Sequence, residues 1–372
     1  MKVVVAIDSF KGSLTSVEAG KAIAEGIRNV SDSEVVIRPV ADGGEGTVDA
    51  LVEGLNGTII KSNVKGPLGS TVEAKWGIIE VDGIKTAVIE MAEAAGINLI
   101  ERSELNPLIT TTFGVGELIK EAITRGIHNF IIGIGGSSTN DGGAGMLQAL
   151  GFGFLDKDNK QIERGAIGLK DLVSIDNSNA LSELSQCSFK IACDVTNPLC
   201  GENGCSKVFG PQKGATEDMI SDMDSWLNRY ADICGGDKDF PGAGAAGGMG
   251  FAFKTFLNAS LEPGIDIVLR ETNLEGYIEI ADIIVTGEGR MDSQTIMGKA
   301  PVGVAALAKK HNKKVIAFCG CASDDAEVCN DYGIDAFFPI MRNVVTIEEA
   351  LDKDNARKNL SKTATQVFRL MR

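Results

Sequence analysis

The sequence predicts an α/β fold in which a doubly wound parallel-sheet domain is built from both termini and interrupted by a second α/β domain. Strand-like and helix-like segments alternate near the N-terminus and again after Asp282. From Thr58 to Glu90, three strand-like runs follow one another with short turns, a spacing typical of antiparallel strands in a mixed sheet. We therefore expect residues 1–58 and 274–372 to form the first domain and residues 59–273 to form the inserted one.

Two strands and two helices are expected at the N-terminal end. The strands are Val3–Ile7 and Val35–Val40, and each leads to an aspartate, Asp8 or Asp42. Thr15 and Glu18 form a capping box that starts the first helix, and the second helix covers about residues 48–55. Because parallel strands end at one edge of a sheet, both aspartates should reach that edge.

The inserted domain is expected to hold five strands and several helices. The strands are Ile59–Val64, Val72–Ile79 (followed by a turn at Asp82-Gly83), Lys85–Ile89, Phe130–Ile134 and Phe189–Cys193. Helices are expected around residues 115–125 and 144–150, after the N-cap Thr216, and after the glycine-rich run 242–250.

The C-terminal end predicts three further strands, Ile283–Val285, Val315–Phe318 and Ala336–Ile340. Pro301 opens an alanine-rich helix, where its missing N–H costs nothing, and Thr346 with Glu349 caps one final helix. The apolar run of the first strand stops at Thr286, so the glycine-broken stretch after it is predicted to be a loop.

Composition narrows the class of function. The 372 residues carry a net charge of −15, which argues against nucleic acid and anionic membrane surfaces as partners. No apolar run is long enough to span a membrane, and we expect a cytoplasmic protein. The eight cysteines form no Cys-x-x-Cys pair, and two histidines are too few for a histidine metal centre. A homodimer is one arrangement that the sequence leaves open.

Two glycine-rich stretches are candidates for binding anions. The stretch after Thr286 combines glycines with acids and cations, which suits a phosphate and its metal ion. The stretch from Gly133 to Gly143 brings small residues, hydroxyls and an acid to a helix start; a tight turn with Asn140 or Asp141 as helix cap is the alternative. The candidate residues, with one lysine from a third loop, are Gly135, Gly136, Ser137, Ser138, Asn140, Asp141, Lys213, Gly287, Gly289 and Lys299.

A Gly-x-Gly-x-x-Gly match from Gly242 to Gly247 raises the alternative of a dinucleotide site. The residues before it do not form a strand, so the context of that motif is missing. Acids at strand ends (Asp8, Asp42 and Asp194) and Asp292 in the glycine-rich stretch favour Mg²⁺ binding and carboxylate base chemistry instead.

Seven segments together resemble the signature stretches of the type-1 glycerate kinase family. They begin at Asp8 (DSFKGSL), Ala41 (ADGGEGT), Gly133 (GIGGSSTNDGG), Asp194 (DVTNPL), Phe209 (FGPQKGA), Gly242 (GAGAAGG) and Thr286 (TGEGRMDSQT). The one departure is Ser138, where alanine is expected. The resemblance implies a flavodoxin-like domain with an inserted α/β domain, and phosphorylation of D-glycerate by ATP, with 2-phosphoglycerate expected ahead of 3-phosphoglycerate.

Phosphoryl transfer requires positioning, charge neutralisation and an oriented nucleophile. We expect Asp194 to be the base and Asp42 and Asp292 to bind Mg²⁺, with Asp8 able to exchange roles with either of them. Lys11, Arg290 and Lys299 are expected to offset the charge of the anions. A nicotinamide-dependent hydroxy-acid oxidoreductase, based on Gly242–Gly247, is the first rival function. A non-catalytic protein that binds a hydroxy acid is the second.

Overall fold

The computed structural model describes residues 1–44, 46–81 and 83–371. Asp82 of the predicted turn and Glu45 of the segment that begins at Ala41 lie outside the described residues. The chain forms two compact units. The terminal unit consists of Met1–Asp42, Asp49–Gly57 and Pro263–Arg372, and the inserted unit of Gly43–Val48 and Thr58–Glu262. The domain boundaries given by the sequence stay a prediction.

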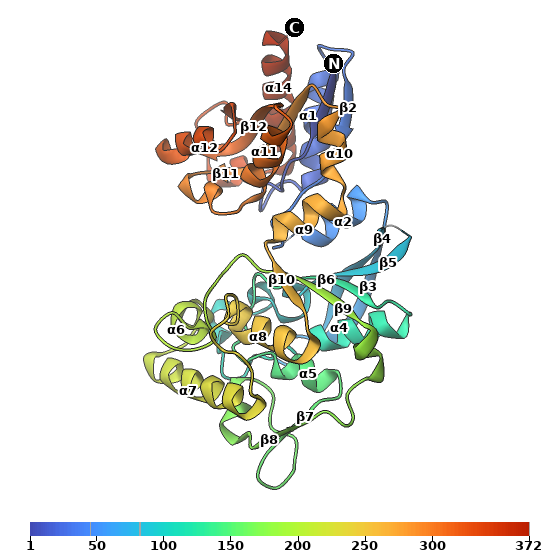
Figure 1. The fold of residues 1–372 in the computed structure, drawn as a ribbon. Coiled ribbons are helices and arrows are strands. Elements are labelled where there is room, and N and C mark those ends of the chain that lie inside the picture. Colours follow the sequence, from blue (N-terminus) through green and yellow to red (C-terminus); the bar gives the residue numbers. More distant parts are fainter. Residues whose placement is uncertain (45, 82, 372) are drawn as a thin grey trace. The chain divides into compact units, whose positions relative to one another are not determined.

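A five-stranded parallel sheet forms the centre of the terminal unit (Figure 1). Its strands are β1 (Lys2–Val5), β2 (Glu34–Ile37), β11 (Ile283–Met291), β12 (Lys314–Ala322) and β13 (Ala336–Pro339). They lie in the order β13-β12-β11-β1-β2, which is the order of flavodoxin-like folds when the strands are counted along the chain. This confirms the predicted fold class.

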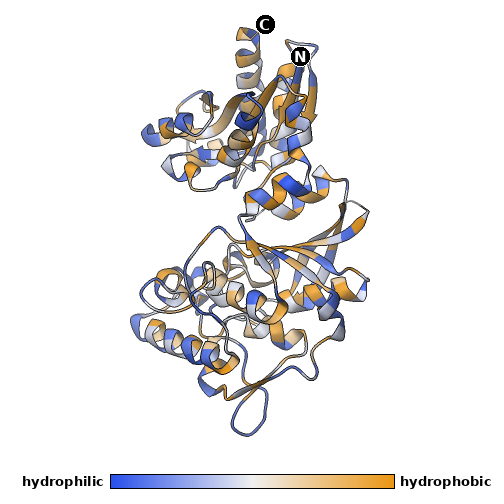
Figure 2. Cartoon of the chain, in the orientation of Figure 1, coloured by the Kyte–Doolittle hydropathy of each residue, from blue (hydrophilic) through white to orange (hydrophobic). Residues whose placement is uncertain are grey.

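Helices cover this sheet on both faces. They are α1 (Ser16–Arg28), α2 (Thr47–Gly54, which begins in the inserted unit), α9 (Gly264–Glu271), α10 (Leu274–Glu279), α11 (Ala300–Lys310), α12 (Val328–Asp331), α13 (Ile347–Leu351) and α14 (Lys353–Leu370). Alternate strand residues such as Val3, Val5 and Val285 pack with apolar residues of α1 and α14. Val4 and Ile284, which point the other way, are fully buried as well. The central strands are accordingly hydrophobic in Figure 2.

The capping box of α1 forms as predicted. The Thr15 hydroxyl accepts the Glu18 N–H at 3.2 Å, and the Glu18 carboxylate accepts the Thr15 N–H at 3.1 Å. The prediction of one final helix was wrong. The box at Thr346 starts only the short α13, and Asp352 caps a second helix, α14, by accepting the N–H of Asn355 at 2.9 Å.

The loop predicted after Thr286 was also wrong, because β11 continues to Met291. Glu288 pairs with Cys319 of β12, and Arg290 pairs with Cys321. Gly287 has a φ of +147°, and a Cβ there would lie 1.8 Å from the carbonyl oxygen of Phe318. The glycines therefore allow β11 and β12 to approach closely, and they do not break the strand.

The inserted unit contains a mixed six-stranded sheet in the order β10-β9-β6-β5-β4-β3. The predicted antiparallel meander is β3 (Thr58–Lys65), β4 (Thr71–Val81) and β5 (Ile84–Glu90). It continues into the parallel strands β6 (Asn129–Gly133), β9 (Ser188–Ala192) and β10 (Ser260–Glu262). The three-residue β10, and the separate pair β7 (Gly153–Leu155) and β8 (Ser174–Asp176), are too short to give a recognisable pattern.

Six helices of the inserted unit pack around this sheet: α3 (Ala92–Ala95), α4 (Phe113–Thr124), α5 (Ala144–Ala149), α6 (Cys205–Phe209), α7 (Glu217–Cys234) and α8 (Ala245–Leu257). Their apolar residues join those of the strands in one buried cluster, which includes a stacked pair, Phe130 and Phe189. None of the helices in the described residues has the length and apolar character needed to cross a membrane.

Candidate active site

A cavity of about 340 Å³ lies in the terminal unit, where β1 and β11 end. The chain leaves β1 for β2 on one side, while β11 is followed by β12 on the other, so this is the topological switch point of the sheet. Ligands of open α/β sheets bind at such points. Six predicted site residues line the cavity: Asp8, Lys11, Asp42, Gly289, Arg290 and Lys299.

Asp8 is a buried carboxylate in the lining of this cavity. Its backbone N–H donates to the Gly287 carbonyl at 2.9 Å, and its Oδ1 accepts the Ser9 N–H at 2.6 Å. Only 4% of the residue is exposed. Burial, and next the charge of Asp42, raise the pKa of Asp8 to about 7. A carboxylate with such a pKa can accept and release a proton near neutral pH.

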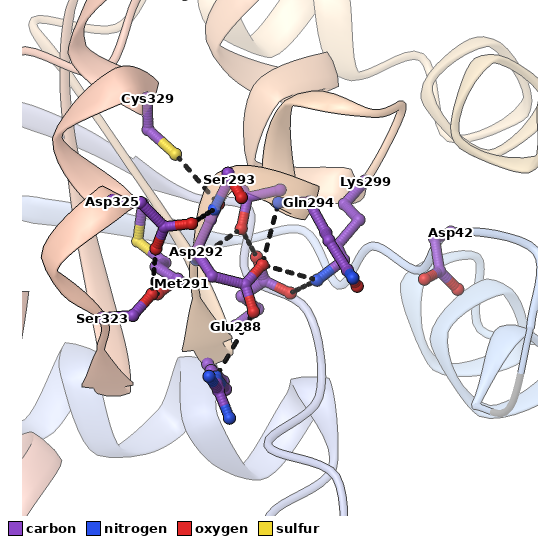
Figure 3. A network of polar contacts seen from close by, with 12 residues as sticks. Asp42, Glu288, Met291, Asp292, Ser293, Gln294, Lys299, Ser323, Asp325 and Cys329 are labelled. Atoms are coloured by element: carbon purple, nitrogen blue, oxygen red, sulfur yellow. Dashed lines mark hydrogen bonds and ion pairs between the residues drawn. The ribbon is translucent and has the colours of Figure 1, made fainter.

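Glu288 and Lys299 form the other side of the charged lining. Lys299 Nζ lies 3.5 Å from Glu288 Oε2 and 3.8 Å from Asp292 Oδ1, and Figure 3 shows the amine directed at both carboxylates. The Thr295 hydroxyl donates to Glu288 Oε1 at 2.6 Å. Burial raises the pKa of Glu288, while Thr295 and Lys299 oppose the shift.

Asp292 has a local structural role. Its Oδ1 accepts the Gln294 N–H at 3.0 Å and so caps the 3-10 turn Ser293–Ile296, and its Oδ2 lies 3.3 Å from Arg290 Nε. Asp42, by contrast, faces Lys11, whose Nζ lies 3.8 Å from Asp42 Oδ2. Two exposed cations, Lys11 and Arg290, therefore stand beside two partly buried acids.

The acids of this cavity suit a hard cation such as Mg²⁺. Asp8, Asp42 and Glu288 line one cavity, and after burial the charges of Asp42 and Glu288 also raise the pKa of Asp8, while Lys11 opposes the shift. Within the described ranges, no three His, Cys, Asp or Glu side chains form a group that would hold a metal ion by themselves. Mg²⁺ in kinases is held by one or two carboxylates together with phosphate oxygens, which this donor set allows.

The predicted anion loop of the inserted unit, Gly133–Gly143, turns most of its side chains inward. Gly135 and Gly136 are exposed, whereas the next five residues are buried. The Ser138 hydroxyl donates to the Ala95 carbonyl at 2.9 Å, and the Asn140 amide donates to the Ser206 hydroxyl at 2.8 Å. A ligand that reaches this loop would therefore meet Gly135 and Gly136 first.

Asp141 holds the loop to two helix starts. It accepts the N–H and the hydroxyl of Thr112, both at 2.9 Å, and the N–H groups of Gly143 at 3.1 Å and Gly145 at 3.3 Å. Complete burial raises the pKa of Asp141, and these hydrogen bonds oppose the shift.

Lys213 lies beneath the same loop and is 1% exposed. Its ammonium donates to the Ser137 hydroxyl at 2.9 Å and to the Thr139 carbonyl at 2.7 Å. Burial lowers the pKa of Lys213 to about 8. Its bonds hold the loop, and Ser137, one of its two partners, is 8% exposed.

The glycine-rich run Gly242–Gly248 packs against this loop. The Gly142 N–H donates to the Gly247 carbonyl at 2.9 Å, and a Cβ on Gly247 would lie 2.1 Å from the Thr139 carbonyl oxygen. Among the described residues, the run follows helix α7 directly, with no strand between that helix and the run. Close backbone packing explains these glycines, which leaves the dinucleotide interpretation without its structural context.

Asp194 follows the end of β9 in the inserted unit and is exposed. Two further acids were not among the predicted site residues. Glu90, at the end of β5, is 4% exposed and accepts the N–H groups of Val48 at 2.7 Å and Gly46 at 3.3 Å. Glu288 is the second. Like Asp8, Glu90 is an acid that directly follows an apolar strand-like run, so the sequence pattern that indicated Asp8 could also have indicated Glu90.

Comparisons with known proteins show the family to which the chain belongs. The family model described as the glycerate kinase family matches residues 3–372. The chain is 49% identical to glycerate 2-kinase of Escherichia coli (94% of this chain, 93% of the relative), and 48% identical to glycerate kinase of Haemophilus influenzae (100% and 99%). A crystal structure from Salmonella typhimurium LT2 superposes with a TM-score of 0.90 at 46% identity, covering 100% of this chain and 98% of the other. The chain therefore belongs to the glycerate kinase family.

Proposed function

We propose that this protein transfers the γ-phosphate of ATP to a hydroxyl group of D-glycerate and releases 2-phosphoglycerate. The observation that carries the proposal is the family match over residues 3–372, together with 49% identity to a relative named glycerate 2-kinase. The cavity at the switch point supports it, because acids and cations of the kind that phosphoryl transfer requires line one space.

Three cations offset the charge of the phosphates in this proposal. Lys11, Arg290 and Lys299 all line the cavity, and a protein with a net charge of −15 must concentrate positive potential locally to bind a polyanion. When bound, Mg²⁺ would neutralise the phosphate oxygens, held by Asp42 with Asp292 as a second candidate. Asp42 is the better placed of the two, since Asp292 already caps a turn and contacts Arg290.

The proton of the attacking hydroxyl needs an acceptor, and two aspartates are candidates. Asp194 is exposed after β9 and precedes Asn197-Pro198. Asp8 is buried, and its pKa of about 7 suits a general base. The exposed part of the Gly133–Gly143 loop, Gly135 and Gly136, is our candidate for binding an anionic group of a substrate, with the buried Ser137 hydroxyl directly after it.

A coupled assay tests the function. Protein is mixed with ATP, Mg²⁺ and D-glycerate, and ADP is followed; a parallel reaction with NAD follows NADH. We expect ADP release that depends on glycerate and no NADH. NADH formation would support the oxidoreductase, and binding of glycerate without ATP turnover would support the non-catalytic protein.

The base is identified by comparing Asp194→Asn with Asp8→Asn at saturating Mg²⁺. Loss of the base should lower kcat while the affinity for ATP stays nearly intact. If Asp194→Asn turns over normally and Asp8→Asn is inactive, Asp8 is the base and the assignment of Asp194 is wrong.

A further inference from the structure

The lining of the cavity at the switch point includes apolar residues that phosphate and metal binding do not explain. These residues are Phe10, Ile340, Met341, Ala350, Leu351 and Ala356. Three segments supply these side chains: the turn after β1, the chain after β13, and the junction of α13 with α14. Part of this surface is open to solvent, since Leu351 is 45% exposed and Met341 is half-buried.

These apolar residues line the same cavity as the cations. Lys11 follows Phe10 directly. The next residue, Gly12, has a φ of +79°, and a Cβ on Gly12 would lie 3.8 Å from Leu351 Cδ2. One ligand in a cavity of about 340 Å³ would therefore meet both an apolar wall and ammonium and guanidinium groups.

We infer that the apolar lining residues of this cavity bind the base of a nucleotide, with the phosphates directed to Lys11, Arg290 and Lys299. This inference rests on the proposed function, whose two ligands differ in chemistry. Glycerate has three carbons, each bearing oxygen, and offers nothing to an apolar wall. A nucleoside triphosphate carries a planar base and a polyanion at opposite ends.

An unpartnered hydroxyl in the cavity lining supports an oxygen-rich ligand. Ser13 lines it, and the buried Oγ of Ser13 has no hydrogen-bond partner in the part of the chain that the structure describes. A buried hydroxyl without a partner is unfavourable, so a ligand oxygen that restores the bond would add affinity. Ribose and phosphate both present such oxygens.

The test uses calorimetric titration of the full chain with two probes, ADP and inorganic tripolyphosphate, both with Mg²⁺. Leu351→Asp places a charge at the apolar wall, and Ala350→Trp fills the space beside it. Ile347→Asp is the matched control, because Ile347 lies on the same helix α13, is 78% exposed and does not line the cavity. We expect ADP to bind about tenfold or more weakly to both cavity variants, while tripolyphosphate binding stays within about twofold of the parent protein.

The control should bind both probes as the parent does. Unchanged ADP affinity in both cavity variants would overturn the inference, as would an equal loss in Ile347→Asp. Failure of the proposed function gives a different result. If ADP binding follows the predicted pattern but glycerate is not phosphorylated, the nucleotide site stands and the substrate assignment fails.

Discussion

The ammonium of Lys213 donates a hydrogen bond of 2.9 Å to the Ser137 hydroxyl inside the inserted unit. Because the same ammonium also holds the Thr139 carbonyl at 2.7 Å, one lysine fixes two points of the Gly133–Gly143 loop. The Ser137 oxygen accepts this bond, so its own proton is left to point to another acceptor. A buried lysine thus determines how the hydroxyl at the edge of the loop is presented.

Lys213→Met should destabilise the protein by about 1–3 kcal/mol, since it leaves two buried acceptors without a donor. Urea unfolding measures the change. Lys207→Met is the control: Lys207 is exposed and pairs with Glu202 at 2.5 Å on the surface, where such pairs contribute about 0–1 kcal/mol. Equal effects of the two substitutions would show that the Lys213 bonds do not hold the loop.

Glu90 predicts a pH dependence of stability. Burial raises its pKa to about 7 from an ordinary value of 4.5. Between these values the unfolded chain releases the proton and the folded protein keeps it, so Glu90 lowers the free energy of unfolding as pH rises from 4.5 to 7. Glu90→Gln has no titratable group at this position. Its free energy of unfolding relative to that of the parent should therefore increase by about 1–3 kcal/mol from pH 4.5 to pH 7.

Unfolding in urea at pH 5 and pH 7.5 measures this difference. Glu80→Gln is the control, since Glu80 lies at the exposed end of the neighbouring strand β4. A Glu90→Gln profile parallel to that of the parent would contradict the account of Glu90 as a buried carboxyl that retains its proton.

Replacing a metal ligand should raise the Mg²⁺ concentration that half-maximal activity requires. We expect this for Asp42→Asn, and a smaller effect for Asp292→Asn, because an amide oxygen binds Mg²⁺ more weakly than a carboxylate. Activity is measured over a Mg²⁺ titration at saturating ATP, with the exposed Asp324→Asn as control. A Mg²⁺ requirement for Asp42→Asn equal to that of Asp324→Asn would remove Asp42 from the metal site.

Replacing a cation of the cavity by alanine should lower kcat/KM, and we expect this for Lys11→Ala, Arg290→Ala and Lys299→Ala. A cation that touches the transferring group should cost about 2–4 kcal/mol of transition-state stabilisation when it is removed. Lys21→Ala, at an exposed position on α1, is the matched control. Any of the three variants whose kinetics stay within about twofold of the parent leaves the list of catalytic cations.

Sequence patterns predicted most strands and helices of the doubly wound domain, because strand periodicity and caps are local features, whereas its flavodoxin-like order was expected from the family resemblance. The capping boxes at Thr15 and Thr346 both form. What could not be predicted depends on neighbours distant in the chain. Gly287 looks like a loop glycine, and only the approach of Phe318 to within 1.8 Å of a Cβ shows why a strand requires it.

In the candidate site, too, some features could be predicted from local sequence and others depend on tertiary structure. The pattern of acids at strand ends found Asp8 and Asp42, and the structure places both at one cavity. Lys213 carries no signal in the sequence that separates a lysine facing a ligand from one that holds a loop, since burial is a tertiary property. The apolar lining of the cavity could not be predicted from the sequence either, because Phe10 is far in the chain from Met341 and Leu351.

Phosphorus NMR of the reaction mixture tests the central claim most directly. The protein is incubated with ATP, Mg²⁺ and D-glycerate, and the spectrum is compared with those of authentic 2- and 3-phosphoglycerate. We predict that the γ-phosphate signal of ATP disappears while signals of ADP and 2-phosphoglycerate grow in equal amounts. A spectrum in which ATP persists, or in which it yields only ADP and inorganic phosphate, would contradict the account.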